Sequence, residues 1–557
     1  MEKRFFLALL LTGAVVVLTP MVFPRPRSNA PITVVDSAVA AAAAVAAAQP
    51  APRDGAPAAA MSSGKGAIAS PALAAAPPGQ AAETLVVRTA LSAYTFSGLG
   101  AAPLQVQADS FPALNGTKGR VVLRHGREPL LRFRVVMAGD TIPLDQMVFA
   151  AAKARGSDGA PQVTFTASRG VTSVTIVYRF TPDNYVATTN VQVTGLSGPA
   201  FLLVDLPTGF DTQEADSLDD IRHLSYAVKP LAQGARGIPF TKLDEGESTL
   251  EPGPLSWAVA KNKYFLVGML APTGGKPFAE AHIVGGARTR KLATRGAATV
   301  VLALDNGKAA FELYAGPQSW ERLHKIGREF ETANPYGGFM QPVVQPFATI
   351  VMRVLLWMKK TVRLDYGFVL VIFGVVVRLL LWPLNQSAMR TSIRMQRIQP
   401  ELQEIQGKYK SDPQKQQAEI MRVYKEHGMS PFSAFSGCLP MLIPMPVLFA
   451  LFFVFQNTIE FRGVPFLWLQ DISMHDPLYA LPLLMGASAF ALSWIGMRNS
   501  PPNPQAKMMS YIFPVMMTFI FLNQAAGLNL YYAVQNLAAL PQQWLIANER
   551  ARSQKKG

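Results

Sequence analysis

The residue with the clearest chemical meaning is Arg378, which interrupts an otherwise apolar run from Tyr366 to Leu384. A charge inside a membrane span costs several kcal/mol, so it normally faces protein or water. Arg378 lies about six residues from the end of the run, or roughly 9 Å along a helix. Either the side chain snorkels to nearby headgroups, or it carries a fixed positive charge into a polar cavity. We favour the cavity, because that depth is near the limit of an arginine's reach.

Other polar side chains in the last two apolar stretches fit such a cavity. Hydrogen bonds between helices explain most of them equally well. They are Thr518, Asn523, Gln524, Asn529, Tyr531, Tyr532, Gln535 and Asn536, of which Asn523 and Gln524 are expected in a short turn.

Signatures of enzymes are absent from the sequence. There is no His-Glu-x-x-His, Gly-x-Ser-x-Gly or Walker motif, and the six histidines have no ligand spacing. A single cysteine, Cys438, excludes an intrachain disulfide and a zinc site built on cysteines. We therefore expect a protein that is not an enzyme and has no metal or cofactor.

Composition indicates a membrane protein with an anionic partner. Half of the 557 residues are hydrophobic, the mean hydropathy is +0.19, and the apolar residues concentrate near the N-terminus and in the C-terminal part. The formal charge of +16 favours lipid headgroups, ribosomal RNA or acidic peptide segments as partners.

The N-terminal part divides into three regions. Residues 1–23 read as a first transmembrane helix, with a cleaved signal peptide as the alternative. Residues 24–83 are rich in Ala and Pro and read as a flexible periplasmic linker. Residues 84–330 show short segments of period-two alternation, such as Gln162–Ala167, Val174–Phe180 and Thr299–Leu304. These segments predict an all-β sandwich domain, with a helix near Ser319–Phe330 that leads back to the membrane.

The C-terminal part contains five further apolar stretches. Before them, residues 331–360 form a connector whose end, Pro346–Lys360, mixes basic and apolar residues as an interfacial amphipathic helix does. Residues 361–546 are expected to form the helical core, followed by a basic tail at 547–557. The stretches are Tyr366–Leu384, Leu439–Phe455, Leu478–Gly496, Met508–Leu522 and Leu528–Ile546.

The distribution of Lys and Arg predicts the orientation. Residues 385–430 carry eight of them, whereas the next connection, 457–476, carries only Arg462. By the positive-inside rule we expect six spans, both termini in the cytoplasm and the β domain in the periplasm. Arg378 then lies in the inner half of the bilayer, and its cavity would open to the cytoplasm.

Residues 385–430 are expected to form a cytoplasmic helical hairpin. Apolar residues recur at helical spacing, Asp412-Pro413 supplies the start of the second helix, and His427-Gly428 supplies its end. Pro400 would kink or restart the first helix. The hairpin is either a solvated face or a docking surface for a cytoplasmic partner. The basic residues for such docking are Arg390, Arg394, Arg397, Lys408 and Lys410.

In combination, several motifs resemble the YidC/Oxa/Alb insertase family, in its Gram-negative form. The resemblance covers the first span and nearly everything from the β domain onward. The matching segments are Leu313-Tyr-Ala-Gly316-Pro317, Asp365-Tyr-Gly-Phe368, Val-Arg378-Leu-Leu-Leu-Trp-Pro383, Met395-Gln-Arg-Ile-Gln-Pro400, Gly437-Cys438-Leu-Pro440, Pro446-Val-Leu-Phe-Ala-Leu-Phe452, Pro465-Phe-Leu-Trp-Leu-Gln-Asp-Ile-Ser473, Asp476-Pro-Leu-Tyr-Ala-Leu-Pro482 and Gly527-Leu-Asn-Leu-Tyr531-Tyr532.

The resemblance implies an inner-membrane insertase and chaperone whose polar groove is closed outside but open to the cytoplasm and lipid. Arg378 matches the groove arginine, and with it we assign Thr518, Tyr532 and Gln535 to the substrate groove. The implied external domain is a β-super-sandwich. The implied partners are nascent membrane proteins, the Sec translocon, the ribosome, the signal recognition particle pathway and the lipid bilayer.

The sequence departs from the family pattern in three places. Residues 430–436 replace a compact Asn-Pro turn, Pro444 stands where glutamine is common, and Gly374 where threonine often lines the groove. We therefore expect a less polar groove. Two alternatives remain for the whole protein: a small-molecule transporter, although no internal repeat is evident, and a structural scaffold for the translocon.

Overall fold

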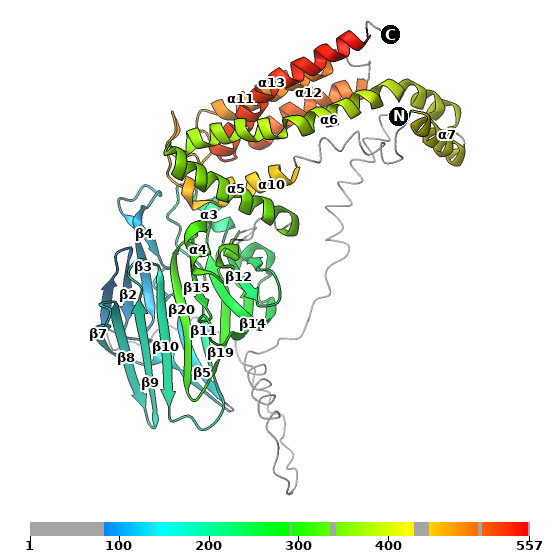
Figure 1. Ribbon diagram of the computed structural model, residues 1–557. Coiled ribbons are helices and arrows are strands. Elements are labelled where there is room, and N and C mark those ends of the chain that lie inside the picture. Colours follow the sequence, from blue (N-terminus) through cyan, green and yellow to red (C-terminus); the bar gives the residue numbers. More distant parts are fainter. Residues whose placement is uncertain are drawn as a thin grey trace, which may run out of the picture. The chain divides into compact units, whose positions relative to one another are not determined.

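The computed structural model describes residues 83–137, 139–289, 292–334, 341–410, 412–427, 445–498 and 504–554. These residues form two compact units, a β-rich one up to residue 334 and a helical one from residue 341 (Figure 1). The predicted first span, the signal-peptide alternative and nearly all of the Ala/Pro-rich linker lie outside the described residues.

The β-rich unit consists of antiparallel strands in a four-stranded sheet, a 14-stranded sheet and a two-stranded ribbon. The four-stranded sheet has the order β1-β2-β3-β4, and the two-stranded one pairs β17 with β18. The strands are β1 (Thr84–Arg88), β2 (Ser92–Ser97), β3 (Pro103–Pro112), β4 (Arg120–Leu123), β5 (Arg132–Met137), β6 (Asp140–Pro143), β7 (Ala150–Arg155), β8 (Pro161–Arg169), β9 (Thr172–Phe180), β10 (Val186–Thr194), β11 (Ala200–Asp205), β12 (Ser225–Pro230), β13 (Arg236–Pro239), β14 (Ser248–Lys261), β15 (Phe265–Leu270), β16 (Phe278–Gly285), β17 (Arg288–Thr289), β18 (Leu292–Ala293), β19 (Gly296–Leu304) and β20 (Lys308–Pro317).

Aromatic side chains join the two larger sheets into the predicted sandwich. Along β9, Val174, Ile176, Tyr178 and Phe180 are buried, so the alternation in the sequence marks the inner face. The Phe96 ring of β2 lies 4.8 Å from the Tyr178 ring, and the Tyr178 hydroxyl donates to the Ala101 carbonyl at 2.9 Å. The prediction of a β-sandwich is therefore confirmed.

The last segment of this unit is held against the sheet by buried contacts. The predicted helix after β20 is α4 (Trp320–Ile326), followed by the short helix η3 (Phe330–Ala333). The Phe330 ring packs 5.6 Å from Trp257 and 5.4 Å from Tyr314. Three more short helices of the unit are η1 (Leu144–Gln146), α3 (Ser217–Arg222) and η2 (Phe240–Lys242).

A buried lysine also forms hydrogen bonds with the segment that follows β20. The ammonium group of Lys261, at the end of β14, donates to Gln318 Oε1 at 3.2 Å and to Asn334 Oδ1 at 2.5 Å. Burial lowers the pKa of Lys261 to about 7, because the charged form loses its hydration.

The helical unit contains long helices of mostly apolar composition. The described ones are α5 (Gln341–Val362), α6 (Tyr366–Lys408), α7 (Pro413–Glu426), α10 (Met445–Asn457), η5 (Ile459–Phe461), α11 (Ala480–Met497), α12 (Pro504–Phe521) and α13 (Ala526–Gln554). Within the described residues, Tyr366–Pro383 and Ala480–Met497 are long and apolar enough to cross a membrane, and Lys507–Phe521 is a shorter apolar helix. The predicted number of six spans is thus not established.

Contacts between the helices give their relative directions. On α6 and α13, Gly374 packs near Val534 and Arg378 bonds to Gln542, so these helices run parallel. On α11 and α13, Asn536 donates to the Met485 carbonyl and Gly496 packs against Gln543, so they too run parallel. The pairs Gly486–Thr518 and Phe490–Tyr511 make α12 antiparallel to α11.

The surface of the helical unit is apolar where that of the β-rich unit is polar. The described β-rich unit exposes only five large apolar side chains, at Val86, Val148, Val171, Leu218 and Leu231. In the helical unit, exposed apolar side chains cover α6, α11 and α12, with Leu379, Leu380, Leu483, Trp494, Phe519 and Ile520 among them. An extended apolar surface of this kind is stable in lipid and unfavourable in water.

The predicted hairpin is present, with one difference. Asp412 Oδ1 accepts the Lys415 amide at 3.1 Å as the N-cap of α7, and Ile398, Leu402, Val423 and Tyr424 form a buried seam. Helix α6, however, continues from Tyr366 to Lys408 without restarting at Pro400. One proline removes a single backbone donor, and the many other hydrogen bonds of a long helix outweigh that loss.

Helix α5 agrees in part with the predicted interfacial helix. It buries Val344, Ala348, Met352 and Leu355 on one face and exposes Ile350, Arg353, Trp357 and Lys360. The buried face is apolar, and the exposed face mixes large apolar with basic side chains, as expected at a membrane interface.

The buried lysine generates a prediction on pH. Unfolded, Lys261 stays protonated up to its ordinary pKa of 10.5, whereas in the folded protein it loses the proton near 7. Between these values the unfolded state binds more protons, so the free energy of unfolding of the β-rich unit rises with pH, by up to about 1.4 kcal/mol per unit. Thermal unfolding of the full chain at pH 7, 8 and 9 should show this rise, and Lys261→Met should flatten it. Lys153→Met, at an exposed position of β7, is the control, and an unchanged slope in Lys261→Met would contradict the assignment.

Candidate functional site

Arg378 is held by a bonded chain of side chains between α6 and α13. Its Nη2 donates to Gln542 Oε1 at 2.8 Å, and Gln542 Nε2 donates to the Trp382 carbonyl at 3.0 Å. Gln542 is only 2 % exposed, so its amide has no freedom to turn away. The glutamine therefore fixes the position of the guanidinium group.

The charge of Arg378 has no compensating carboxylate among the described residues. None of the ion pairs found there involves this arginine, and its electrostatic neighbour is the neutral phenol of Tyr531. Its Nε is buried and has no hydrogen-bond acceptor in the described part of the chain. A guanidinium has five N–H donors, so this half-buried group can still bind a carboxylate or water.

Tyr531, rather than Tyr532, lies near the arginine. Tyr531 is buried, with its ring 5.8 Å from Phe373 of α6 and 6.3 Å from Phe455 of α10. The Tyr532 ring packs at 5.4 Å against Phe521 of α12. The two adjacent tyrosines therefore point to different neighbouring helices.

The other two predicted groove residues lie on α12 and α13. The Thr518 hydroxyl donates to the Pro514 carbonyl at 2.8 Å in its own helix, and the side chain packs against Gly486 of α11. Gln535 is half-buried on α13, seven residues before Gln542. The structure thus joins Arg378 to α13 directly, and it places Thr518 in a contact between α11 and α12.

Gly374 is a departure from the family pattern with a packing reason. A Cβ atom at this position would lie 3.1 Å from Val534 Cγ1 and 3.6 Å from Tyr531 Cδ2. The glycine therefore allows α6 to approach α13 closely, and a threonine would crowd that contact. Pro444, Cys438 and the altered turn at 430–436 lie outside the described residues.

The ends of the helices opposite Arg378 are closed by aromatic packing. Phe461 lies 5.2 Å from both Tyr366, at the start of α6, and Phe455, near the end of α10. Leu528 and Ala526, at the start of α13, are fully buried. Aromatic side chains therefore pack this end of the bundle, where the polar side chains of Asn457, Arg462 and Asn529 are also buried, whereas Arg378 and Gln542 lie farther along α6 and α13.

The basic residues of the hairpin share one region of the chain. Arg390, Arg394 and Arg397 follow the i, i+4, i+7 spacing of one face on the backbone of α6. Lys408 and Lys410 are exposed, and the ammonium groups of Lys408 and Lys415 lie 5.8 and 5.7 Å from the Tyr409 ring. This concentration of positive charge suits an anionic partner.

Gln542 was not expected from the sequence. The signal that could have found it is the seven-residue spacing between Gln535 and Gln542, which places two amides on one face of the helix.

Comparison with protein families gives two matches that together cover most of the chain. Residues 87–350 match the family described as the YidC periplasmic domain, and residues 357–554 match the family described as 60Kd inner membrane protein.

Named relatives agree with these matches. The chain is 32 % identical over 399 residues to the membrane protein insertase YidC of Anaeromyxobacter dehalogenans, covering 70 % of this chain and 69 % of the relative. It is 30 % identical over 401 residues to that of Chlorobaculum tepidum, covering 67 % and 65 %. A crystal structure of YidC from Thermotoga maritima is 15 % identical and covers 83 % of this chain and 98 % of its own, with a TM-score of 0.29. A TM-score this low supports no conclusion.

The Thr518 contact generates a prediction on stability. Gly486→Ala would place a Cβ atom 2.0 Å from Thr518 Oγ1, so we expect a loss of about 1–3 kcal/mol in the free energy of unfolding. Thr518→Ala in the same chain should restore most of it, as measured by unfolding in detergent. The control is Gly407→Ala in α6, where a Cβ atom meets nothing within 4 Å. If Gly486→Ala behaved like this control, Thr518 would not be a packing residue.

Proposed function

The chain belongs to the YidC family of membrane protein insertases, and from this we propose that it inserts nascent transmembrane segments through a polar groove that contains Arg378. The observation that carries the proposal is the guanidinium group itself, which Gln542 orients and no described carboxylate neutralises. Such a group attracts acidic residues on a substrate.

The physical problem for an insertase is the polar tail of its substrate. Carrying that tail through hydrocarbon unaided costs several kcal/mol for each charged group. A groove that holds water from the cytoplasmic side shortens the dry path, and Arg378 stabilises an acidic tail at its inner end. The apolar segment of the substrate moves into lipid by its own hydrophobic burial, so no nucleotide is needed.

The proposed topology has six spans, both termini in the cytoplasm and the β-rich unit in the periplasm. The parallel directions of α6, α11 and α13, with α12 antiparallel, are those that alternating spans require. With α6 running inward, Arg378 lies about 18 Å from its outer end, in the inner half of a core about 30 Å thick. The aromatic packing around Phe455 and Phe461 then closes the bundle at the periplasmic side.

The proposed groove residues besides Arg378 are Thr518, Tyr532 and Gln535, to which we add Gln542 as the residue that positions the arginine. Thr518 and Tyr532 contribute less to the proposed groove than Arg378 does. The Thr518 hydroxyl is already hydrogen-bonded, and the Tyr532 ring packs against Phe521.

We propose the hairpin as the docking surface for cytoplasmic partners, of which the ribosome and the signal recognition particle pathway present anionic RNA. Arg390, Arg394, Arg397, Lys408 and Lys410 supply the positive charge. The Sec translocon is the proposed membrane partner, and a purely structural role beside it is an outcome that the experiment below separates.

The test of the groove is insertion into liposomes that contain only the purified chain. The substrate is a single-span protein with an acidic tail, and the readout is protease protection of that tail. Arg378→Glu should reduce protection about tenfold or more, which corresponds to about 1.4 kcal/mol. A matched substrate with a neutral tail should insert nearly normally, because only the attraction to the arginine is lost.

Two control variants sharpen this test. Arg353→Glu, at an exposed position of α5, should leave insertion unchanged, and Arg378→Lys should retain part of the activity. Normal insertion of the acidic tail by Arg378→Glu would exclude the role of the arginine. No protection by the folded parent chain would indicate a scaffold or a helper of the translocon.

The hairpin gives a separate prediction. Lys408→Glu with Lys410→Glu should weaken binding of the full chain in nanodiscs to purified ribosomes by tenfold or more, and added salt should weaken the parent in the same way. Cosedimentation measures it, with Lys153→Glu on β7 as the matched control. Equal binding by the two variants would mean that the hairpin is only a solvated face.

A further inference from the structure

The connection between α10 and α11, residues 462–479, contains two segments that the proposed function does not use. One segment includes Leu467 and Trp468, and the other includes Leu478 and Tyr479. One face of this connection joins the ends of several helices. The Phe466 ring packs 5.2 Å from Phe368, and a Cβ atom at Gly367 would lie 2.0 Å from the same ring, so only glycine fits there. The Ile472 carbonyl accepts the Gly527 amide at 2.9 Å, which ties the connection to the start of α13.

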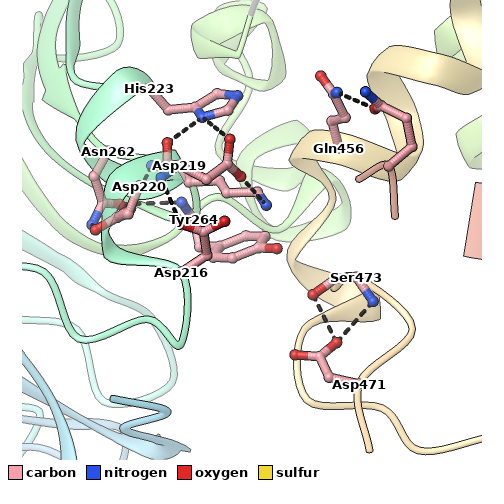
Figure 2. A network of polar contacts seen from close by, with 11 residues as sticks. Asp216, Asp219, Asp220, His223, Asn262, Tyr264, Gln456, Asp471 and Ser473 are labelled. Atoms are coloured by element: carbon pink, nitrogen blue, oxygen red, sulfur yellow. Dashed lines mark hydrogen bonds and ion pairs between the residues drawn. The ribbon is translucent and has the colours of Figure 1, made fainter. Parts of the chain in front are cut away.

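Hydrogen-bonded carboxylates make the connection rigid. Asp471 Oδ1 accepts the amide of Ser473 at 2.8 Å and its hydroxyl at 2.7 Å (Figure 2). Asp476 is fully buried and accepts the amides of Leu478 and Leu481 at 3.0 and 2.8 Å. It also accepts the indole N–H of Trp468 at 3.0 Å. These bonds fix the position of both segments.

The other face of the connection exposes large apolar side chains. Leu467 is 70 % exposed, Leu478 66 %, and Trp468 and Tyr479 are each 42 % exposed. Leu467 and Tyr479 have left-handed backbones, with φ of 52° and 53°. A non-glycine residue in that region costs about 1 kcal/mol or more, so the surrounding bonds hold a strained backbone whose side chains remain outside.

The position of the connection identifies what covers this face. Tyr479 directly precedes α11, Ala480–Met497, a helix long and apolar enough to cross the membrane. The end of a span lies at the boundary between hydrocarbon and headgroups, where Trp and Tyr are enriched. No Lys or Arg stands between 463 and 479, so the face offers apolar area and aromatic rings rather than positive charge.

We propose that Leu467, Trp468, Leu478 and Tyr479 insert into the outer leaflet and set the depth of the helical unit in the bilayer. Hydropathy alone assigns this connection to the periplasmic solution. The partner is the acyl and glycerol region of the lipid surface, which accepts apolar side chains about 5–10 Å below the headgroups. The inference rests on the membrane topology of the proposed function but not on insertion activity.

The experiment uses the full chain with its single cysteine removed, Cys438→Ser, and one new cysteine. Leu467→Cys or Leu478→Cys carries an environment-sensitive nitrobenzoxadiazole label in phosphatidylcholine–phosphatidylglycerol liposomes. Ala152→Cys, at an exposed position of β7, is the control in solution. Leu478 has an ordinary backbone, so this variant keeps the test valid if Leu467→Cys disturbs its strained position.

We expect blue-shifted emission at 467 and 478, quenching by lipids with a nitroxide near the headgroup, and at least threefold less quenching by aqueous iodide than at 152. Iodide quenching equal to that at 152, with none by nitroxide lipids, would overturn the proposal. Iodide quenching that decreases only when the protein density in the liposomes is raised would also overturn it. A second copy of the chain, rather than lipid, would then cover the face. Neither readout requires insertion of a substrate, so failure here and failure of the proposed function are distinguishable.

Discussion

A positive charge placed among apolar helices is the constraint on which the helical unit depends. Arg378 cannot lose its proton, so the chain must satisfy the guanidinium group or leave it in contact with water. The buried amide of Gln542 satisfies part of it, and the parallel approach of α6 and α13 at Gly374 brings that amide within reach. The remaining donors can still bind water or an acidic group.

Much of the fold follows from patterns that are local in the sequence. Alternating burial in β9 and the cap at Asp412 each depend on residues within one element, and both were predicted. The order of a 14-stranded sheet, with β5 beside β11 and β10 beside β20, depends on pairings between distant segments that no local period encodes. The continuity of α6 through Pro400 was missed because the local cost of a proline is visible in the sequence. The many other backbone hydrogen bonds of the long helix, which outweigh that cost, are not.

Residues of the candidate site could be predicted from the sequence where placing them in an apolar segment costs free energy. Arg378 stands out because a charge in an apolar run needs a reason. Gln542 does not, since an uncharged amide in a long helix is ordinary, and its role emerges only from its bond to the arginine. The choice between Tyr531 and Tyr532 depends on the rotation of α13 against three neighbours, which sequence spacing leaves open.

Helix α6 has a mechanical consequence. Its 43 residues extend over about 65 Å, roughly twice the hydrocarbon thickness, so one element carries both Arg378 and the first half of the hairpin. Because no break in the helix separates them, a force on the hairpin would act on the element that holds Arg378, against the packing of α6 on α13.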